Sequence, residues 1–248
     1  MAEKRKDVMR DAAKAAVENT SSNAEIAAFL DKARTMAPAA AKAPGKRGRL
    51  VFALDATMSR QPTWDTACTL QAEMFREAGN VGGLDIQHVY YRGFNECRAG
   101  KWAGDADALA SMMTRIDCRG GQTQIGRILK HVRNETKKAP VQAMVFVGDA
   151  VEENIDALCA IAGELGLLKV PAFVFQEGFD STAEQAFREI ARLTGGAFCR
   201  FDPGSAAQLK QLLSAVAVYA AGGYKALADL SKARGGPARL MIEQMQGQ

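Results

Sequence analysis

The sequence predicts an α/β protein built on a mostly parallel sheet with helices on both faces. From Leu50 onward, short apolar runs alternate with longer amphipathic runs, which is the pattern of strands that alternate with helices. Most of the apolar runs are nearly continuous, and strands of that kind are buried on both faces of a sheet. The ligand site of such a sheet lies at the carboxyl ends of its strands, so the residues that end each run are the first candidates for function.

Each element follows from its own local pattern. Strands are short apolar or alternating runs bounded by turn residues. They are expected at residues 50–54, 84–93, 96–102, 141–149, 170–178 and 197–201. Helices are longer runs with apolar residues at helical spacing. They are expected at residues 64–79, 105–116, 123–138, 154–168, 183–195 and 206–220.

Composition divides the chain into an α/β domain with segments on either side. These parts are an N-terminal helical arm (1–37), a basic linker rich in Pro and Ala (38–48), the α/β domain (49–221) and a C-terminal helical appendage (222–248). Ser22 and Glu25 form a capping-box pattern that starts the helix of the arm. An apolar stripe follows at helical spacing, and it either packs on its own domain or docks on a partner.

Composition and charge argue against several classes of protein. The net charge of +4 comes from the first 49 residues, which hold 11 Lys and Arg against 6 Asp and Glu. No aromatic residues are interleaved with these basic ones, so nucleic acid is not an expected partner. No apolar run approaches the roughly 20 residues of a membrane span, and no secretory signal is recognised. The five scattered cysteines form no C-x-x-C pair, which argues against disulfide or zinc frameworks and favours a reducing cytoplasm.

Two of the buried runs end in an aspartate. Asp55 closes the first run and Asp149 closes the fourth, and the carboxyl ends of parallel strands meet at one edge of the sheet. Thr57 and Ser59 follow Asp55 on the same turn, and Thr123 follows a pair of glycines before a helix. Carboxylate and hydroxyl oxygens, without imidazole or thiolate, suit Mg²⁺, Mn²⁺ or Ca²⁺. We therefore expect these oxygens to converge on a hard cation.

These residues resemble the metal-ion-dependent adhesion site of the von Willebrand factor type A family. The motif of that family is D-x-S-x-S, with a threonine on a middle loop and an aspartate after the fourth strand. The matching residues are Asp55, Thr57 (in place of the first serine), Ser59, Thr123 and Asp149. The resemblance covers roughly residues 48–220 and implies a doubly wound, Rossmann-like sheet with one antiparallel edge strand at residues 96–102. Met58 departs from the family, which often has glycine there.

The resemblance also implies a protein-interaction module rather than an enzyme. The five residues would bind Mg²⁺ or Mn²⁺ and leave one coordination position for an Asp or Glu of a protein partner. A site with few anionic ligands leaves the cation electrophilic enough to attract such a carboxylate. The family further implies a cytoplasmic multi-protein assembly, with an ATPase as one candidate partner.

Two alternatives remain open at this point. In the first alternative, Asp55 is an ordinary helix cap and Thr57 and Ser59 are turn residues. Residues 55–59 also resemble the D-x-T-x-T motif of haloacid-dehalogenase-type phosphatases, in which Asp55 would be the nucleophile and Asp149 would hold Mg²⁺. The phosphatase hypothesis gives Thr123 no role, and more β/α steps follow Asp149 than that topology usually has.

Two further carboxylates follow Asp149 closely. Glu152 and Glu153 are expected at the start of the helix at residues 154–168, where negative charge interacts favourably with the helix N-terminus. A place at the rim of the site is the second possibility for them.

Overall fold

The computed structural model describes residues 47–64, 84–105 and 115–201, with the single residues 108, 111, 112, 216 and 220. This part of the chain forms a six-stranded sheet in the order β3-β2-β1-β4-β5-β6. The strands are β1 (Gly48–Asp55), β2 (Leu84–Arg92), β3 (Glu96–Ala103), β4 (Ala143–Gly148), β5 (Ala172–Glu177) and β6 (Ala197–Phe201). All six predicted strands are present, with bounds that differ by a few residues.

Every neighbouring pair of strands is parallel except β2 and β3, which form an antiparallel hairpin at one edge. The predicted fold class is therefore confirmed. In the strand order, β2 lies next to β1 on one side and β4 lies next to it on the other, so β1 lies where the winding direction reverses. In doubly wound sheets the carboxyl end of a strand at that position opens the crevice in which ligands bind.

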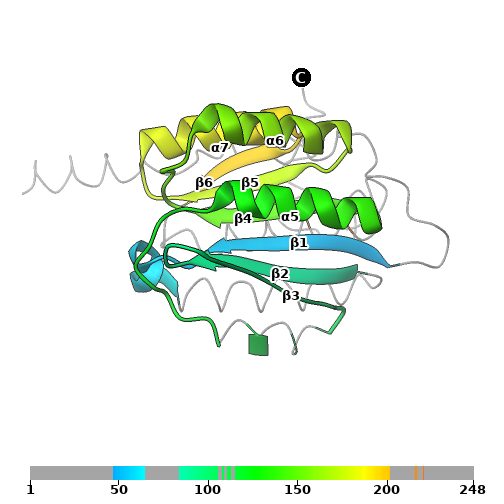
Figure 1. Ribbon diagram of the computed structural model, residues 1–248, viewed down its shortest axis with the longest axis horizontal. Helices are drawn as coiled ribbons and strands as arrows, with labels where there is room; N and C mark the ends of the chain where they lie inside the picture. Colours follow the sequence, from blue (N-terminus) through cyan, green and yellow to red (C-terminus); the bar gives the residue numbers. More distant parts are fainter. Residues whose placement is uncertain are drawn as a thin grey trace, which may run out of the picture.

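Three helices cover one face of this sheet (Figure 1). They are α5 (Ile125–Lys138), α6 (Ile155–Leu167) and α7 (Ser181–Leu193), and a short 3-10 helix, η1 (Met58–Thr63), follows β1. Local capping explains two of the helix starts, because the side chains of Asn154 and Asp180 accept hydrogen bonds from the backbone of Ala157 and Ala183. None of the described helices is both long and apolar enough to cross a membrane.

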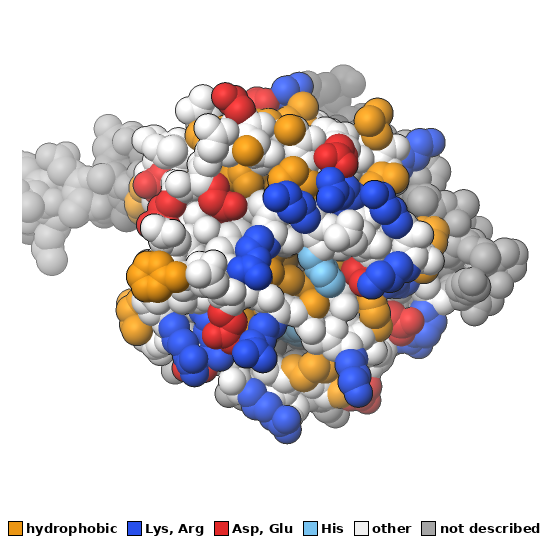
Figure 2. Space-filling view, in the orientation of Figure 1, with side chains coloured by type: hydrophobic (Ala, Val, Ile, Leu, Met, Phe, Trp, Pro, Cys, Tyr) orange, Lys and Arg blue, Asp and Glu red, His pale blue; other side chains and the backbone are white. Residues whose placement is uncertain are grey.

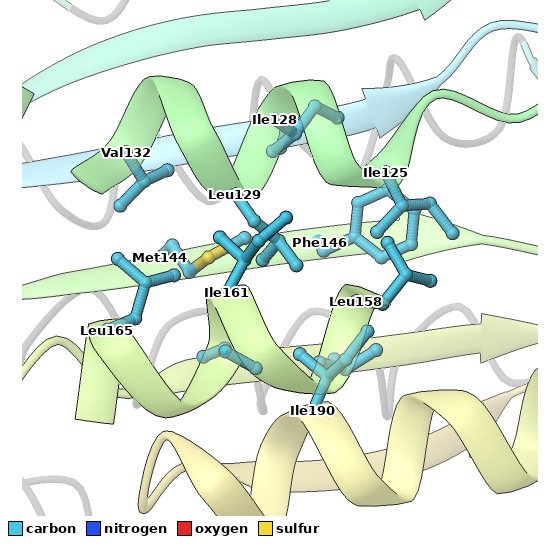
Figure 3. Close-up of a cluster of buried hydrophobic side chains, with 14 of the residues drawn as sticks. Ile125, Ile128, Leu129, Val132, Met144, Phe146, Leu158, Ile161, Leu165 and Ile190 are labelled. Carbon is cyan, nitrogen blue, oxygen red and sulfur yellow. The ribbon is translucent and has the colours of Figure 1, made fainter. Parts of the chain in front are cut away.

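The core lies between these helices and the sheet. Figure 3 shows Leu129 of α5 on the side of that helix that faces β4, with Leu165 of α6 beside Met144 of β4. Residues that point to the other face of the sheet are buried as well. They include Leu50, Phe52, Leu54, Val145, Phe173 and Phe175, all without solvent exposure. Burial on both faces explains why the strands are apolar at consecutive positions rather than at alternate ones.

Several predicted segments lie outside the described residues. They are the arm (1–37), nearly all of the linker (38–48), the appendage (222–248), nearly all of the helices at 64–79 and 206–220, and much of the helix at 105–116. The predicted division of the chain into four parts therefore stays a prediction.

Candidate functional site

Asp55 ends β1 with its carboxylate completely buried. One carboxylate oxygen accepts a hydrogen bond from the backbone N–H of Thr57 (2.7 Å), and the other accepts one from the hydroxyl of Tyr91 (2.8 Å). Burial raises the pKa of Asp55 from 3.8 to about 6, because desolvation outweighs the hydrogen bonds from Thr57 and Tyr91, and the nearby charge of Asp149 raises the pKa further. The site therefore holds its first carboxylate where a negative charge is unfavourable.

Thr57 and Ser59 place two hydroxyl groups side by side at the start of η1. Their side-chain oxygens lie 3.1 Å apart, with Thr57 buried and Ser59 exposed. Two adjacent ligands of an octahedral Mg²⁺ lie about 2.9 Å apart, because each lies about 2.1 Å from the ion at a right angle to the other. The spacing of the two hydroxyls fits such a pair of ligands.

Asp149 follows β4 at the same edge of the sheet. β1 and β4 are paired so that Leu54 lies opposite Val147, which sets Asp55 level with Gly148 and one residue before Asp149. One carboxylate oxygen of Asp149 is buried and has no hydrogen-bond partner in the described structure. Leaving a buried acceptor unsatisfied costs about 1–3 kcal/mol, and more when it is charged, so a donor or a cation at this oxygen would be favourable.

Thr123 is fixed to the loop that follows Asp149. Its backbone N–H donates to the carboxylate of Glu152 (2.9 Å), and its hydroxyl oxygen accepts from the backbone N–H of Glu152 (3.0 Å). The loop before Thr123 also runs beside the residues after β1, since the N–H of Arg119 donates to the carbonyl of Ala56 (3.0 Å). The structure therefore brings together the three segments that carry the five predicted residues. Asp55, Thr57 and Ser59 are linked by hydrogen bonds, Asp149 lies within electrostatic range, and Thr123 is tied to the Asp149 loop.

The prediction for Glu153 was wrong in one respect. Its carboxylate accepts hydrogen bonds from the backbone N–H groups of Ile125 and Gly126, so it caps α5, the preceding helix, rather than α6. The carboxylate of Glu152 likewise accepts a hydrogen bond from a backbone N–H group, that of Thr123 in the loop before α5. The predicted favourable contact between a carboxylate and a helix N-terminus exists, but the helix comes 28 residues earlier in the chain.

Sequence reasoning also missed Tyr91, Arg60 and Glu177. Tyr91 pairs with Asp55 in the β1–β2 register, so only the register between the strands could have revealed it. Arg60 is completely buried directly after Ser59 and forms an ion pair with Glu177 at the end of β5. This pair spans the end of β4 and holds the loop with the two hydroxyls against the sheet. Arginine side chains are usually exposed, so the sequence did not indicate that Arg60 is buried or that it pairs with Glu177.

The chemistry of the donor set fits a hard cation. Two carboxylates supply the charge, two neighbouring hydroxyls supply neutral ligands, and Asp149 offers an oxygen without a partner. The described residues contain no cluster of three or more His, Cys, Asp or Glu that could hold a metal ion, so such a site would depend on the hydroxyls as well as the carboxylates.

Comparison with known proteins identifies the fold. No family model and no curated protein sequence matches the chain. Solved structures do match, among them a von Willebrand factor type A protein from Catenulispora acidiphila, with a TM-score of 0.57 and 18% identity over 70% of this chain. The SpRpn10 VWA domain matches 68% of the chain with a TM-score of 0.54 and 14% identity. The pilus adhesin SpaC from Lactobacillus rhamnosus GG matches 76% with a TM-score of 0.56 and 11% identity.

These likenesses concern the fold. The match spans 92% of the SpRpn10 domain but 43% of the Catenulispora protein and 31% of SpaC, so the chain corresponds to one part of those two longer proteins. The chain has the fold of von Willebrand factor type A domains, as the motif resemblance implied. The five metal-site residues stay a prediction.

Proposed function

We propose that this chain is a metal-dependent protein-interaction module. Mg²⁺ or Mn²⁺ would be held by Asp55, Thr57, Ser59, Thr123 and Asp149, and a partner's Asp or Glu would complete its coordination. The observation that carries the proposal is the buried oxygen of Asp149, which has no hydrogen-bond partner in the described structure although the surrounding loops are otherwise well bonded.

The roles of the chain's own residues follow from their contacts. Asp55 is fixed by Thr57 and Tyr91, so it supplies charge from a fixed position behind the two hydroxyls. Ser59 is exposed, so it faces the side from which a partner would approach. The cation, when bound, would supply the electrophilic position that attracts the partner's carboxylate. No covalent bond needs to break in this mode of action, and we propose that the chain is not an enzyme.

The comparisons support an interaction role by analogy of fold. Two similar structures are named as von Willebrand type A proteins or domains, and a third is named as a pilus adhesin. We further propose that the partner belongs to a cytoplasmic multi-protein assembly, for which an ATPase is the leading candidate. The support for this context is the family resemblance and the five cysteines, which are scattered and form no C-x-x-C pair.

Calorimetric titration of the full chain with MgCl₂ and MnCl₂ tests the metal site. Asp149→Asn should weaken binding by at least about tenfold, because it removes one of two anionic groups. Asp156→Asn, which changes an exposed carboxylate in the first turn of α6, is the matched control and should bind as the wild type does. Equal metal binding by Asp149→Asn would remove the site assignment. Turnover of an aryl phosphate that disappears in Asp55→Asn would favour the phosphatase instead.

A further inference from the structure

An exposed aromatic side chain lies at the tip of the β2–β3 hairpin. Phe94 is 69% exposed, more than any other aromatic residue in the described ranges. It lies in the turn between Arg92, which ends β2, and Glu96, which begins β3. A large apolar side chain held in water at the carboxyl end of β2 has no role in the core; because single exposed apolar residues are common on protein surfaces, its neighbours decide whether it has a role in binding.

The turn that carries Phe94 is firmly held. Its Gly93 carbonyl accepts hydrogen bonds from the backbone of Gln122 (3.2 Å) and the side chain of Gln124 (3.1 Å). Gly121 packs so closely on Gly93 that a Cβ atom there would lie 2.1 Å from it. An aromatic group on a fixed turn loses little conformational entropy when it is buried by a partner, which favours a role in binding.

Guanidinium groups surround the same turn. Arg92, Arg98 and Arg119 form an ion-pair network with Glu96 and Asp117. Arg127 adds a fourth guanidinium, which donates to the carbonyl of Asn95 (2.8 Å). Four positive groups therefore face two carboxylates. Figure 2 shows Lys and Arg side chains beside hydrophobic ones at the end of the molecule toward which β1 runs.

This turn lies next to the candidate metal site. The backbone of Arg119 forms an isolated β-bridge with that of Thr57, and the backbone N–H of Arg119 donates to the carbonyl of Ala56 (3.0 Å). The loop that carries Arg119 therefore borders the metal-site loop directly. The side chain of Arg119 is 55% exposed and that of Arg98 is 69% exposed, so both are available to a bound molecule. A partner segment that reaches the cation would continue over Arg119 toward Phe94.

We propose that the hairpin face, defined as Phe94, Arg98, Arg119 and Arg127, binds an acidic segment of the protein partner that carries an apolar side chain. This inference rests on the proposed function, because the same segment would supply the carboxylate for the metal. The excess of guanidinium groups attracts acidic residues, and Phe94 provides the apolar contact. A protein segment is favoured over nucleic acid because a single aromatic side chain is no platform on which successive bases could stack.

The test is selection of a random peptide library, displayed on phage, against the immobilised full chain in Mg²⁺. The selected peptides should combine Asp or Glu with an apolar residue, and synthetic copies should bind Phe94→Ser at least about fivefold more weakly than the wild type. Leu167→Ser is the matched control, because Leu167 is 86% exposed at the far end of α6. Arg98→Glu should weaken binding by a similar factor. Its control, Arg192→Glu, reverses an equally paired and exposed arginine at the end of α7 and should have no effect.

The outcomes separate this inference from the proposed function. Wild-type affinity in Phe94→Ser and Arg98→Glu, with binding still lost in chelator, overturns the hairpin face and leaves the metal role standing. Weaker binding by both variants, with no change in chelator, supports the hairpin face and removes the metal role. Peptides without acidic residues, or a library that yields no binder, overturn the inference. A single-stranded oligonucleotide that binds through Arg98 while no peptide does so overturns it in favour of nucleic acid.

Discussion

Two buried carboxylates in this molecule have opposite surroundings. Glu135 of α5 accepts hydrogen bonds from Arg49 (2.9 Å), Trp102 (3.0 Å) and Lys138 (2.6 Å). Burial alone would raise the pKa of Glu135, but the hydrogen bonds from Lys138 and Trp102 and the charge of Lys138 outweigh it, so the pKa is lowered. Asp55 has no cationic partner among its described contacts and lies near Asp149, so its pKa is raised to about 6.

The difference separates a structural acid from a candidate functional one. Around Glu135 the chain supplies every counter-charge itself, and Arg49 additionally stacks on Trp102 with 3.8 Å between the guanidinium carbon and the ring centre. At the rim the chain places two carboxylates together and leaves an oxygen of Asp149 without a partner. Carboxylates that lie together without a counter-charge from the chain are typical of sites that receive a ligand. Three measurements test this difference between the two carboxylates.

The largest effect is expected on the structural side. Glu135→Ala should lower the free energy of unfolding by about 3 kcal/mol, because it leaves the largely buried guanidinium of Arg49 without its carboxylate. Chemical denaturation in urea measures this change. Glu189→Ala, which removes the partner of the exposed Arg192, should cost less than about 1 kcal/mol. Equal losses in the two variants would mean that Glu135 is no more structural than a surface acid.

Acid sensitivity should come next, and it is carried by His88, whereas the raised pKa of Asp55 acts with the opposite sign because the folded protein then binds a proton more readily than the unfolded chain. Burial lowers the pKa of His88 from 6.5 to about 3, so the unfolded chain binds a proton that the folded chain rejects. The free energy of unfolding is therefore unaffected by this group above pH 6.5 and falls as pH decreases toward 3. The contribution of His88 alone to this loss between pH 7 and pH 5 should be about 2 kcal/mol, and protonation of Asp55 should offset about 1 kcal/mol of it.

Urea denaturation at several pH values, with His88→Gln beside the wild type, isolates this contribution. The variant should lose most of the decline between pH 7 and pH 5. Burial also lowers the pKa of His131, which is only half-buried, so His131 contributes with the same sign. His131→Gln is therefore the useful comparison, and it should retain more of the decline in the free energy of unfolding than His88→Gln does. An unchanged slope in His88→Gln would mean that the acid sensitivity arises elsewhere.

The smallest effect should have the opposite sign and lies at the rim. Asp149→Asn should raise the free energy of unfolding in chelator by about 1 kcal/mol, because it removes a like charge beside Asp55 and gives the buried position a neutral group. Thermal melting in chelator and in MgCl₂ measures the stability of the metal-free protein and its stabilisation by metal, and the variant should lose that stabilisation. Destabilisation of the metal-free variant would place Asp149 with Glu135 as a structural acid.

Part of the site could be predicted because it follows from local pattern. Apolar runs that end in Asp55 and Asp149 indicated that both residues lie at the ends of parallel strands, and the strand register sets them at the same edge. Thr57 and Ser59 needed only their closeness to Asp55. Thr123 was placed by its glycine-rich loop and by the motif resemblance, and the structure ties it to the Asp149 loop through Glu152.

Other parts could not be predicted from the sequence. The ion pair between Arg60 and Glu177 joins residues 117 positions apart, and no local pattern identifies such a partner. The capping of α5 by Glu153 was assigned to the wrong helix because a carboxylate near a helix start is normally read against the helix that follows it. The hairpin face around Phe94 was also missed, since its arginines come from β3, α5 and the loop before α5.

The sequence by itself determined the alternation of strands and helices, the burial of both sheet faces and the two aspartates at strand ends. Each of these depends on the period or the polarity of residues that are close along the chain. The tertiary structure decided which charges are neutralised, which oxygen of Asp149 lacks a partner and which side chains surround Phe94. Those outcomes depend on how distant loops pack at the sheet edge, where electrostatic interactions act between residues that share no local pattern.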